Sequence, residues 1–334
     1  MQSPSIHILW EFNDGPWGGG NQFLKALRQE FSAMGCYADN PERADIILFN
    51  SHQHQKKALQ LKRRFPKKIF VHRIDGPIAL ARGESGKKTD RSIFFCNRIL
   101  ADGTIFQSSW SRLESMKAGL KQPRFDTCIS NAPDPSIFHP CTPEERKTAT
   151  DSRIKLIATS WSSNPRKGFD IYHYLDKHLD FKRYHMTFVG NTDKPFTNIK
   201  IIEPLPSKQL ADILRHHDIF IAASLMESCS NSFLEGLHSG LPAIARNNTS
   251  HPEILAGNGL LFNGTEDILE QIDTLASRLD DFRSKLKVRH ISEIAMQYHR
   301  FCKLIKESTE NKTYHPKKLS TLKYYIARIR LKTL

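Results

Sequence analysis

Closely spaced cysteines are missing from this sequence of 334 residues. The nearest two of the six cysteines, Cys128 and Cys141, are separated by 12 residues, which excludes CxxC metal knuckles and CxxC redox pairs. Long apolar runs are also missing, because the longest, around 219–226, is far shorter than the roughly 18 residues of a membrane-spanning helix. The N-terminal residues lack the basic start and apolar core of a signal peptide. We therefore expect a cytoplasmic protein and leave peripheral contact with a membrane open.

Acidic residues are absent from two stretches that hold the excess positive charge. The chain carries 49 Lys and Arg against 35 Asp and Glu, for a net charge of +14. Residues 56–68 and 312–334 contain seven bases each, and the remaining 298 residues hold 35 bases and 35 acids. A uniformly basic coat for nucleic acid is therefore excluded, and the charge indicates local anionic contacts.

Short apolar segments alternate with longer amphipathic ones along most of the chain, a pattern typical of βαβ units with parallel sheets. In the first half it predicts strands over 6–12, 44–50, 68–74 and 101–108, and helices over 20–34, 52–65, 88–98 and 109–119. In the second half it predicts strands over 155–160, 185–191, 198–203, 218–224, 241–246 and 259–262, and helices over 168–179, 207–216, 230–239, 250–256, 265–280 and 282–307. The pattern therefore predicts an α/β protein with two Rossmann-like domains.

A polar segment with four prolines, residues 130–152, separates the two halves. We assign residues 1–140 to an N-terminal domain, 141–152 to a linker, 153–300 to a second domain, and 301–334 to C-terminal helices and a basic tail. Ligands of such sheets bind beyond the carboxyl ends of the strands. A two-domain protein of this kind is therefore expected to hold its reaction site in a central cleft.

The loops after the first strand of each half carry features that suit phosphate. Gly18, Gly19 and Gly20 lead into a helix, where backbone N–H groups and the helix dipole favour an anion. Arg166 and Lys167 precede another helix and offer a planar fork and a point charge. The glycines do not form the GxGxxG fingerprint of dinucleotide binding. The glycines could instead form a tight turn, and Arg166 and Lys167 could instead be a solvated pair of bases in a surface loop.

The most informative stretch is 216–255. A strand ends at Glu227, a small polar turn follows, and a helix carries Glu235 before Gly240-Leu241-Pro242 closes the unit. Amides of the turn can face an anion or sugar hydroxyls, and the two carboxylates can accept hydrogen bonds from a sugar or a ribose diol. The turn consists of Ser228, Cys229, Ser230, Asn231 and Ser232.

These residues together resemble the retaining glycosyltransferases of family 4, which have the GT-B fold. The resemblance covers nearly the whole chain. It includes the glycine loop, NAPDPSIFHP (131–140), PRKG (165–168), two glutamates separated by seven residues ahead of GLP, and HPEILAGNGLLF (251–262). It implies two Rossmann-like domains that face a central cleft, with C-terminal helices that cross back to the first domain.

The resemblance also implies a donor site. Lys167 would bind the donor diphosphate, Glu227 would contact the transferred sugar, and Glu235 would bind the nucleotide ribose. The remaining donor-binding residues that it implies are Gly18, Gly19, Gly20, Asn164, Arg166, Ser228, Cys229, Ser230, Asn231 and Ser232. His72 and Asp75, at the end of a predicted strand, would lie near the sugar and the acceptor, although a strand-end histidine can equally be a structural residue.

The implied reaction is sugar transfer from a UDP- or GDP-linked donor to a saccharide or glycolipid acceptor, with retention of configuration. No further cofactor is expected, and no metal, because the sequence lacks the DxD-type acidic pair of metal-dependent transferases.

Two departures from the family pattern leave alternatives open. Ser160-Trp161 stands where the family has Gly-Arg, and SCSNS (228–232) stands where a GFG segment is common. Arg166, or Asn164 with neighbouring serine hydroxyls, could replace the missing arginine. A non-catalytic nucleotide-sugar-binding homologue therefore stays possible. A nucleic-acid binder is the other alternative, although the first basic stretch has a single aromatic residue, Phe65, and no RRM, KH or helix-turn-helix pattern occurs.

The C-terminal tail has an amphipathic pattern. In helical projection Leu319, Leu322, Tyr325, Ile326 and Ile329 share one face, with Lys318, Lys323, Arg330 and Lys332 toward its edges. This pattern suits an interfacial helix on anionic lipid. The same stripe could instead pack against the first domain. We expect residues 56–68 and 312–334 to form one docking face toward an anionic membrane or acceptor.

Overall fold

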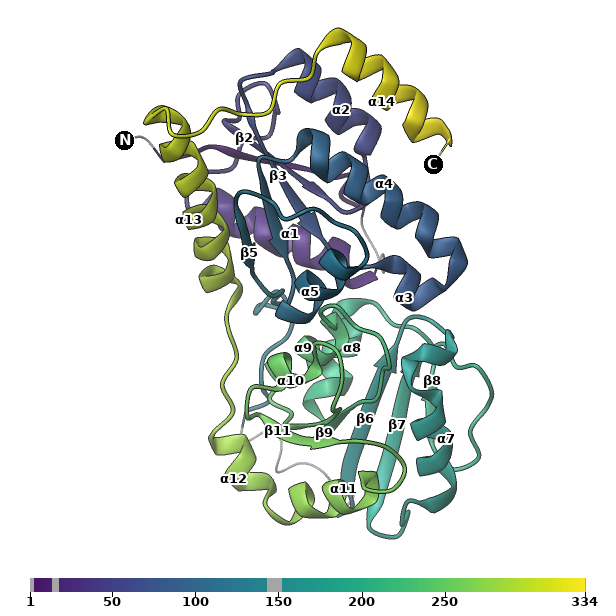
Figure 1. Cartoon of the computed structure of the whole chain (residues 1–334). Coiled ribbons are helices and arrows are strands. Elements are labelled where there is room, and N and C mark those ends of the chain that lie inside the picture. The colour runs from purple at the N-terminus through teal and green to yellow at the C-terminus, as the bar shows by residue number, and fades with distance from the viewer. Residues whose placement is uncertain (1–2, 14–17, 143–151, 334) are drawn as a thin grey trace. The chain divides into compact units, whose positions relative to one another are not determined.

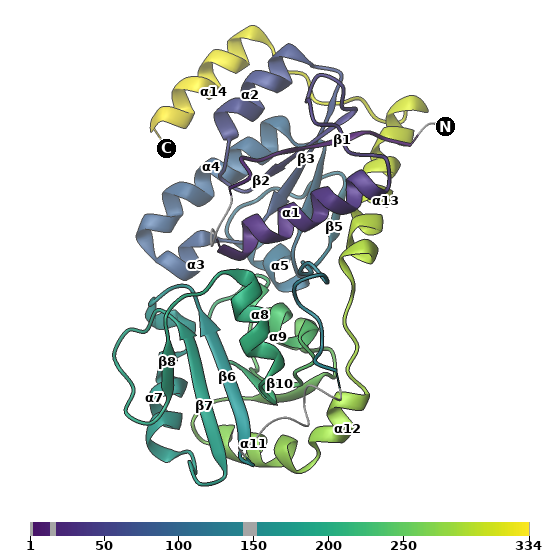
Figure 2. The ribbon, with the colours of Figure 1, turned by 180° about the vertical axis from the view of Figure 1, so that it is seen from behind.

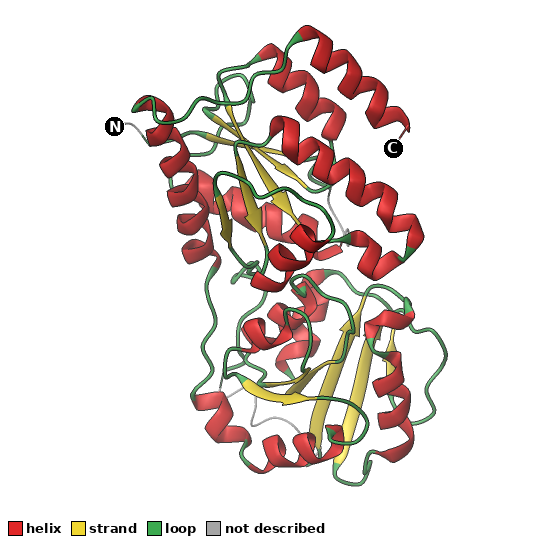
Figure 3. Ribbon diagram, viewed as in Figure 1, coloured by secondary structure: helices red, strands yellow, loops and turns green. Residues whose placement is uncertain are grey.

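The computed structural model describes residues 3–13, 18–142 and 152–333 (Figure 1). The chain divides into two compact units. Unit 1 comprises residues 1–12, 24–130 and 291–334, and unit 2 comprises residues 13–23 and 131–290. Each unit contains one parallel sheet flanked by helices (Figure 3). Most of the predicted linker, residues 143–151, lies outside the described residues.

The sheet of unit 1 has five parallel strands in the order β1-β2-β3-β4-β5. They are β1 (Ile6–Leu9), β2 (Ile46–Asn50), β3 (Ile69–Ile74), β4 (Gly103–Phe106) and β5 (Asp126–Cys128). Ile6 pairs with Ile46 of β2 and also forms an isolated parallel bridge with Tyr37. Tyr37 and β2 therefore lie on opposite edges of β1. After β1 the chain first passes along one edge at Tyr37 and then crosses to the other edge to form β2. The topological switch point of this sheet therefore lies at β1.

Helices cover both faces of this sheet. Apolar residues of α2 (Gln55–Arg64), α4 (Glu84–Leu100) and α14 (Thr321–Thr333) form one cluster with β2 and β3. Figure 2 shows α1 (Gly18–Ala33) in front of the sheet, on the side opposite to the α4 side seen in Figure 1. Phe31 of α1 packs against Tyr298 of α13 (Ile291–Glu310), with ring centroids 6.5 Å apart. Two shorter helices complete the unit, α3 (Ile78–Arg82) and α5 (Ser109–Lys117).

A buried ionic cluster fastens the C-terminal segment to unit 1. The Asp102 carboxylate, which precedes β4, lies 2.9 Å from the Lys62 ammonium, and both side chains are fully buried. It also accepts hydrogen bonds from the Tyr314 hydroxyl (2.7 Å), the Lys317 amide (2.7 Å) and the Phe70 amide (2.8 Å). Several donors compensate the desolvation of this carboxylate. The expected return of the C-terminal helices to the first domain is thereby confirmed.

Unit 2 has six parallel strands in the order β11-β10-β9-β6-β7-β8. They are β6 (Ile154–Ser160), β7 (Tyr184–Gly190), β8 (Lys200–Ile202), β9 (Ile219–Ala222), β10 (Ala243–Arg246) and β11 (Gly259–Phe262). From β6 the chain proceeds to β7 and β8 on one side, and then returns to β9, β10 and β11 on the other. The switch point therefore lies between β6 and β9, at the centre of the sheet.

Two apolar layers sandwich this sheet. One layer contains side chains of α7 (Phe169–His178) and α11 (Ile268–Ser277), including Phe169 and Leu275. The other contains side chains of α8 (Ser207–Arg215), α9 (Asn231–His238) and α10 (His251–Leu255), including Leu214 and Phe233. The short helix α12 (Leu279–Ser284) follows α11. Burial of both faces explains why the strands read as continuous apolar runs.

The alternation of strands and helices is confirmed, with differences at short or interrupted elements. Strand β5 and helix α3 have three and five residues and were not expected. The helix expected over 282–307 begins only at Ile291, because the Asn258 side chain bonds to the amide and the carbonyl of Lys287 (2.8 and 2.7 Å). None of the helices in the described part of the chain combines the length and apolar character needed to cross a bilayer.

Candidate active site

The loops that follow β6 and β9 meet at the switch point of unit 2. Parallel strands present their carboxyl ends at one edge, so residues just after two adjacent strands come close together. Leu156 of β6 pairs with Ile219 of β9. The loop after β6 contains the 3-10 turn η1 (Pro165–Lys167), and the loop after β9 contains Glu227. The amide of Leu225 donates to the carbonyl of Arg166 at 2.7 Å and joins the two loops.

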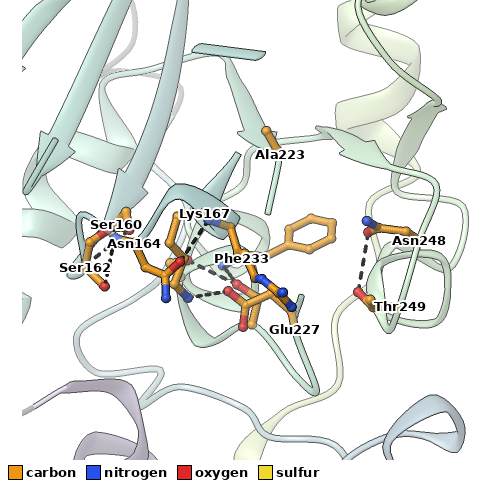
Figure 4. A network of polar contacts seen from close by, with 12 residues as sticks. Ser160, Ser162, Asn164, Lys167, Ala223, Glu227, Phe233, Asn248 and Thr249 are labelled. Atoms are coloured by element: carbon orange, nitrogen blue, oxygen red, sulfur yellow. Dashed lines mark hydrogen bonds and ion pairs between the residues drawn. The ribbon is translucent and has the colours of Figure 1, made fainter. Parts of the chain in front are cut away.

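Lys167 and Glu227 lie at the carboxyl ends of the unit 2 strands, where the loops after β6 and β9 meet. The Lys167 ammonium lies 2.6 Å from a Glu227 carboxylate oxygen, and 31% and 15% of the two side chains are exposed. Figure 4 shows the two side chains pointing toward one another, with Ser160, Ser162 and Asn164 on one side and Asn248 and Thr249 on the other. The carboxylate fixes the direction of a flexible cation that is still open to solvent. A cation held in this way can bind an anionic group.

Local hydrogen bonds shape the turn that carries Lys167. The Asn164 side chain accepts from the Arg166 amide at 2.9 Å and caps η1, and the Ser162 hydroxyl accepts from the Asn164 amide at 3.2 Å. Gly168 ends the turn with φ +90°, where a Cβ would lie 2.3 Å from the carbonyl oxygen of Ala223. Only glycine fits this combination of left-handed backbone and close approach.

The Glu227 loop is held from the far side by the loop after β10. Asn248 donates from its side chain to the carbonyl of Leu225 at 3.2 Å, and the amide of Ser250 donates to the carbonyl of Glu227 at 3.4 Å. Thr249 between them has φ +49°. The sequence pattern predicts no role for these residues, and their position shows that three loops build the site.

The polar turn after Glu227 leads into helix α9. The Ser230 hydroxyl accepts from the Phe233 amide at 3.4 Å and caps the helix. Asn131 donates from its side chain to the Asn231 side chain at 2.9 Å, and its amide contacts the Cys229 sulfur at 3.5 Å. The first turn of α9 therefore directs its amides, including those of Asn231 and Ser232, toward the region after Glu227, where the helix dipole favours an anion.

Glu235 lies one turn further along α9. The next residue, Gly236, lets α9 pack closely against β9, because a Cβ there would lie 2.5 Å from the Phe220 ring. The Glu235 carboxylate has no hydrogen-bond partner among the described residues, and desolvation by burial raises its pKa to about 8. Hydroxyl groups of a ligand that donate hydrogen bonds to this carboxyl would favour its ionised form and supply the partners that it lacks.

His251, the first residue of the HPEILAGNGLLF segment, is a further residue near Glu227. Burial lowers its pKa, and the Glu227 charge acts in the opposite direction. Its Nδ1 lies 3.2 Å from the carbonyl oxygen of Arg246, and its ring packs edge-on against Phe233. The imidazole therefore contacts the end of β10 and helix α9 inside the unit.

His72 lies in the interior of unit 1. All six residues of β3 are buried, His72 is 0% exposed, and its ring stacks on Phe49 with centroids 4.1 Å apart. Its Nε2 lies 2.9 Å from the carbonyl oxygen of Ser51, and burial lowers its pKa to about 3. The histidine is therefore a neutral core residue that a ligand cannot reach without opening of the sheet.

Asp75 belongs to a polar group at the carboxyl ends of the unit 1 strands. Its carboxylate pairs with Arg73 at 2.8 Å and accepts from the side chain of Gln107, while 38% of its surface remains exposed. Arg73 also donates to the Asn50 side chain. This group occupies the edge where ligands of parallel sheets bind. Asn50 and Gln107 each lie at or just after a strand end, which is the sequence signal that could have identified them.

Gly18, Gly19 and Gly20 form the first turn of α1. The helix thus begins directly at the glycines, and the expected approach of an anion to its N-terminus stays a prediction. Residues 14–17, which precede them, lie outside the described residues.

Comparison with known proteins finds a family model that matches part of unit 2. Residues 166–278, which include Lys167, Glu227 and Glu235, match the family model described as glycosyl transferases group 1. An uncharacterized protein, 356, of Sulfolobus islandicus rod-shaped virus 1 is 25% identical over 187 residues, 52% of this chain. The match spans 52% of that viral protein, about half of its length.

Solved structures of similar fold cover nearly the whole chain. The sucrose-phosphate synthase of Thermosynechococcus elongatus aligns with a TM-score of 0.64 and 11% identity, over 93% of this chain and 99% of that one. The HepE protein of Anabaena in complex with UDP-glucose aligns with a TM-score of 0.65 and 12% identity, over 93% and 100%. The chain therefore has the GT-B fold, and its residues 166–278 are similar to the group 1 glycosyl transferases.

Proposed function

We propose that the protein is a retaining glycosyltransferase of family 4 type, which transfers a sugar from a nucleotide diphosphate sugar to an acceptor hydroxyl. The observation that carries this proposal is the ion pair between Lys167 and Glu227, 2.6 Å long, at the switch point of unit 2. A partly exposed cation beside a carboxylate and a helix N-terminus suits a ligand with a diphosphate at one end and hydroxyls at the other.

Each group has a distinct task in this proposal. Lys167 and Arg166 bind the diphosphate, and Asn164 fixes the turn that presents them. Glu227 accepts hydrogen bonds from the transferred sugar, and the amides of residues 228–232 bind sugar and phosphate oxygens. Glu235 accepts hydrogen bonds from the ribose diol. Gly18, Gly19 and Gly20 bring the N-terminal amides of α1 to the diphosphate.

The reaction is a displacement on the face that the leaving group occupies. The bond between the anomeric carbon and the donor phosphate oxygen breaks through an oxocarbenium-like state, and the acceptor oxygen bonds to the same carbon on the same face. An oxygen of the departing diphosphate takes the proton of the acceptor hydroxyl. Positive charge from Lys167 and Arg166 stabilises the diphosphate as its negative charge grows. In this proposal these side chains take the place of a divalent metal.

The donor is UDP- or GDP-linked, and UDP-glucose, which the HepE structure contains, is the first candidate to test. The acceptor is a saccharide or glycolipid in the synthesis of cell-surface polysaccharide, lipopolysaccharide or glycolipid, at the cytoplasmic face of a membrane. The polar group around Asp75, at the carboxyl edge of the unit 1 sheet, is the proposed contact for the acceptor.

The experiment measures thermal unfolding of the full chain with a panel of UDP- and GDP-sugars. At least one should raise the melting temperature. Lys167→Met should weaken binding of that donor by about 10- to 100-fold, since a charge-assisted hydrogen bond is worth about 1.5–3 kcal/mol. Lys182→Met, at an exposed position of the same unit, is the matched control and should bind normally.

Turnover separates the enzyme from a binding homologue. Release of UDP or GDP that depends on an acceptor, and that persists in the presence of EDTA, supports the metal-independent reaction. Stabilisation by a donor without any nucleotide release would identify a non-catalytic binding protein. Absence of stabilisation by every donor, or equal binding by both lysine variants, would refute the proposed site.

A further inference from the structure

Helix α14 has two apolar faces, and only one is covered. Tyr324 and Ala327 are buried against α2 and α4, with 8% and 1% of their surfaces exposed. On the opposite face Leu322, Tyr325, Ile326 and Ile329 are 71%, 52%, 53% and 65% exposed. These four residues follow the i, i+3, i+4, i+7 spacing of one helical face. We call them the apolar stripe. The helix thus packs back on unit 1, while most of the predicted stripe remains at the surface.

A groove that is both basic and apolar borders the stripe. It lies between α4 and the tail and has a volume of about 460 Å³. Phe95, Ile99, Leu319 and Ile326 supply its apolar lining, and no acidic residue lines it. Ile326 belongs to the groove and to the stripe, so the two surfaces are continuous. The four basic residues of the lining are Arg98, Lys317, Lys318 and Lys323.

The bases around this surface are held in place. The Lys317 ammonium donates to the carbonyl of Arg98 at 3.0 Å, near the C-terminal end of α4. The Arg330 guanidinium lies over the Phe95 ring at 4.6 Å, and the Arg63 guanidinium lies over the Tyr324 ring at 4.9 Å. Arg63 comes from α2, which runs beside α14 in Figures 1 and 2. The two acid-free stretches therefore meet on one side of unit 1.

Not every base of residues 56–68 serves this surface. Lys62 is buried in the Asp102 cluster, Arg64 pairs with Glu42, and Lys68 donates to the carbonyl of Glu42 at 2.7 Å. The docking surface is therefore centred on α14 and the groove, with exposed bases of α2 beside it.

We propose that this side of unit 1 docks on an anionic phospholipid bilayer, with the apolar stripe in the interface and a headgroup phosphate in the basic groove. The ligand class follows from the chemistry: cations arranged around a strip of large apolar side chains match a surface that is anionic outside and apolar beneath. A second copy of the chain would bring one basic surface against another, and a nucleic acid would leave the stripe in water. The inference does not depend on the proposed donor chemistry.

The test uses the full chain, because Tyr314 and Lys317 bond to buried Asp102 and truncation of the tail would damage the fold. Flotation with vesicles of phosphatidylcholine and phosphatidylglycerol in equal parts should recover the protein, and vesicles of phosphatidylcholine alone should not. Lys318→Gln with Lys323→Gln should weaken binding about 30-fold, at about 1 kcal/mol per base. The matched control is Lys182→Gln with Lys208→Gln, two exposed lysines of unit 2.

A second pair of variants tests the apolar stripe. Leu322→Ser with Ile329→Ser should reduce binding at least tenfold at unchanged charge, whereas the control Met296→Ser with Leu304→Ser, on the exposed side of α13, should not. All four side chains are substantially exposed, so circular dichroism and melting temperature should stay unchanged. The proposal is overturned if the unaltered protein ignores anionic vesicles or if variants and controls bind alike. It is equally overturned if the stripe variants change only the oligomeric state in light scattering.

Discussion

Glu235→Gln should make the protein more stable, and increasingly so as the pH rises. Burial raises the pKa of Glu235 from its ordinary value of 4.5 to about 8. The folded protein therefore keeps a proton that the unfolded chain releases between these values. The free energy of unfolding is therefore highest, as far as this group is concerned, below pH 4.5, and it decreases progressively as the pH rises toward 8. Glutamine is neutral at every pH and avoids this loss.

The size of the effect follows from the shift. At roughly 1.4 kcal/mol per pH unit the full shift corresponds to about 5 kcal/mol above pH 8. Water reaches part of the side chain and reduces this value, so we expect about 2–3 kcal/mol at high pH and close to zero at about pH 4.5.

Urea unfolding at about pH 5, 7 and 9 measures this difference. Glu270→Gln, at an exposed position of α11, is the control and should change stability little at each pH. Above about pH 8, where Glu235 is ionised, Glu235→Gln should also bind a nucleotide sugar more weakly, because an amide offers fewer acceptor sites than a carboxylate to the ribose diol. A stability difference between Glu235→Gln and the unaltered protein that does not change with pH would refute the assignment of Glu235 as a desolvated, unpartnered carboxyl.

Two further substitutions test features that position the site and the tail. Gly168→Ala should destabilise the protein by more than about 2 kcal/mol in thermal unfolding, because it adds left-handed strain and a backbone clash with Ala223. It should also lower the donor affinity measured by titration, because the clash displaces Lys167. Lys62→Met should cost about 3 kcal/mol in urea unfolding, since it leaves Asp102 buried without its main countercharge, and a cost below about 1 kcal/mol would contradict the role of this pair.

The meeting of Lys167 and Glu227 could be predicted from the sequence, because parallel strands present their carboxyl ends at one edge. Support from Asn248 and Ser250 could not be predicted in the same way. Their contacts depend on the left-handed backbone of Thr249, a non-glycine residue whose conformation tertiary packing imposes. Sequence pattern together with the family resemblance therefore indicated two loops of the site, and the third required the structure.

The burial of His72 shows a different limit. In a parallel sheet both faces are covered, so the alternation that marks solvent-facing residues is absent and a polar residue in a strand gives no sign of its environment. Helix α14 shows a third limit. Its pattern shows apolar residues on more than one side of the helix but not which side packs, and the least exposed of them is Ala327, the smallest, at 1%.

The discontinuity of unit 1 has a consequence for biosynthesis. Its sheet is encoded before residue 131, but Tyr314 and Lys317, which complete the hydrogen bonds of Asp102, leave the ribosome only after residues 131–290. The intervening residues 131–290 contain all the strands of unit 2, which can fold while the first sheet still lacks its C-terminal helices. The sheet of unit 1 is therefore synthesised before that of unit 2, but unit 1 is completed after unit 2.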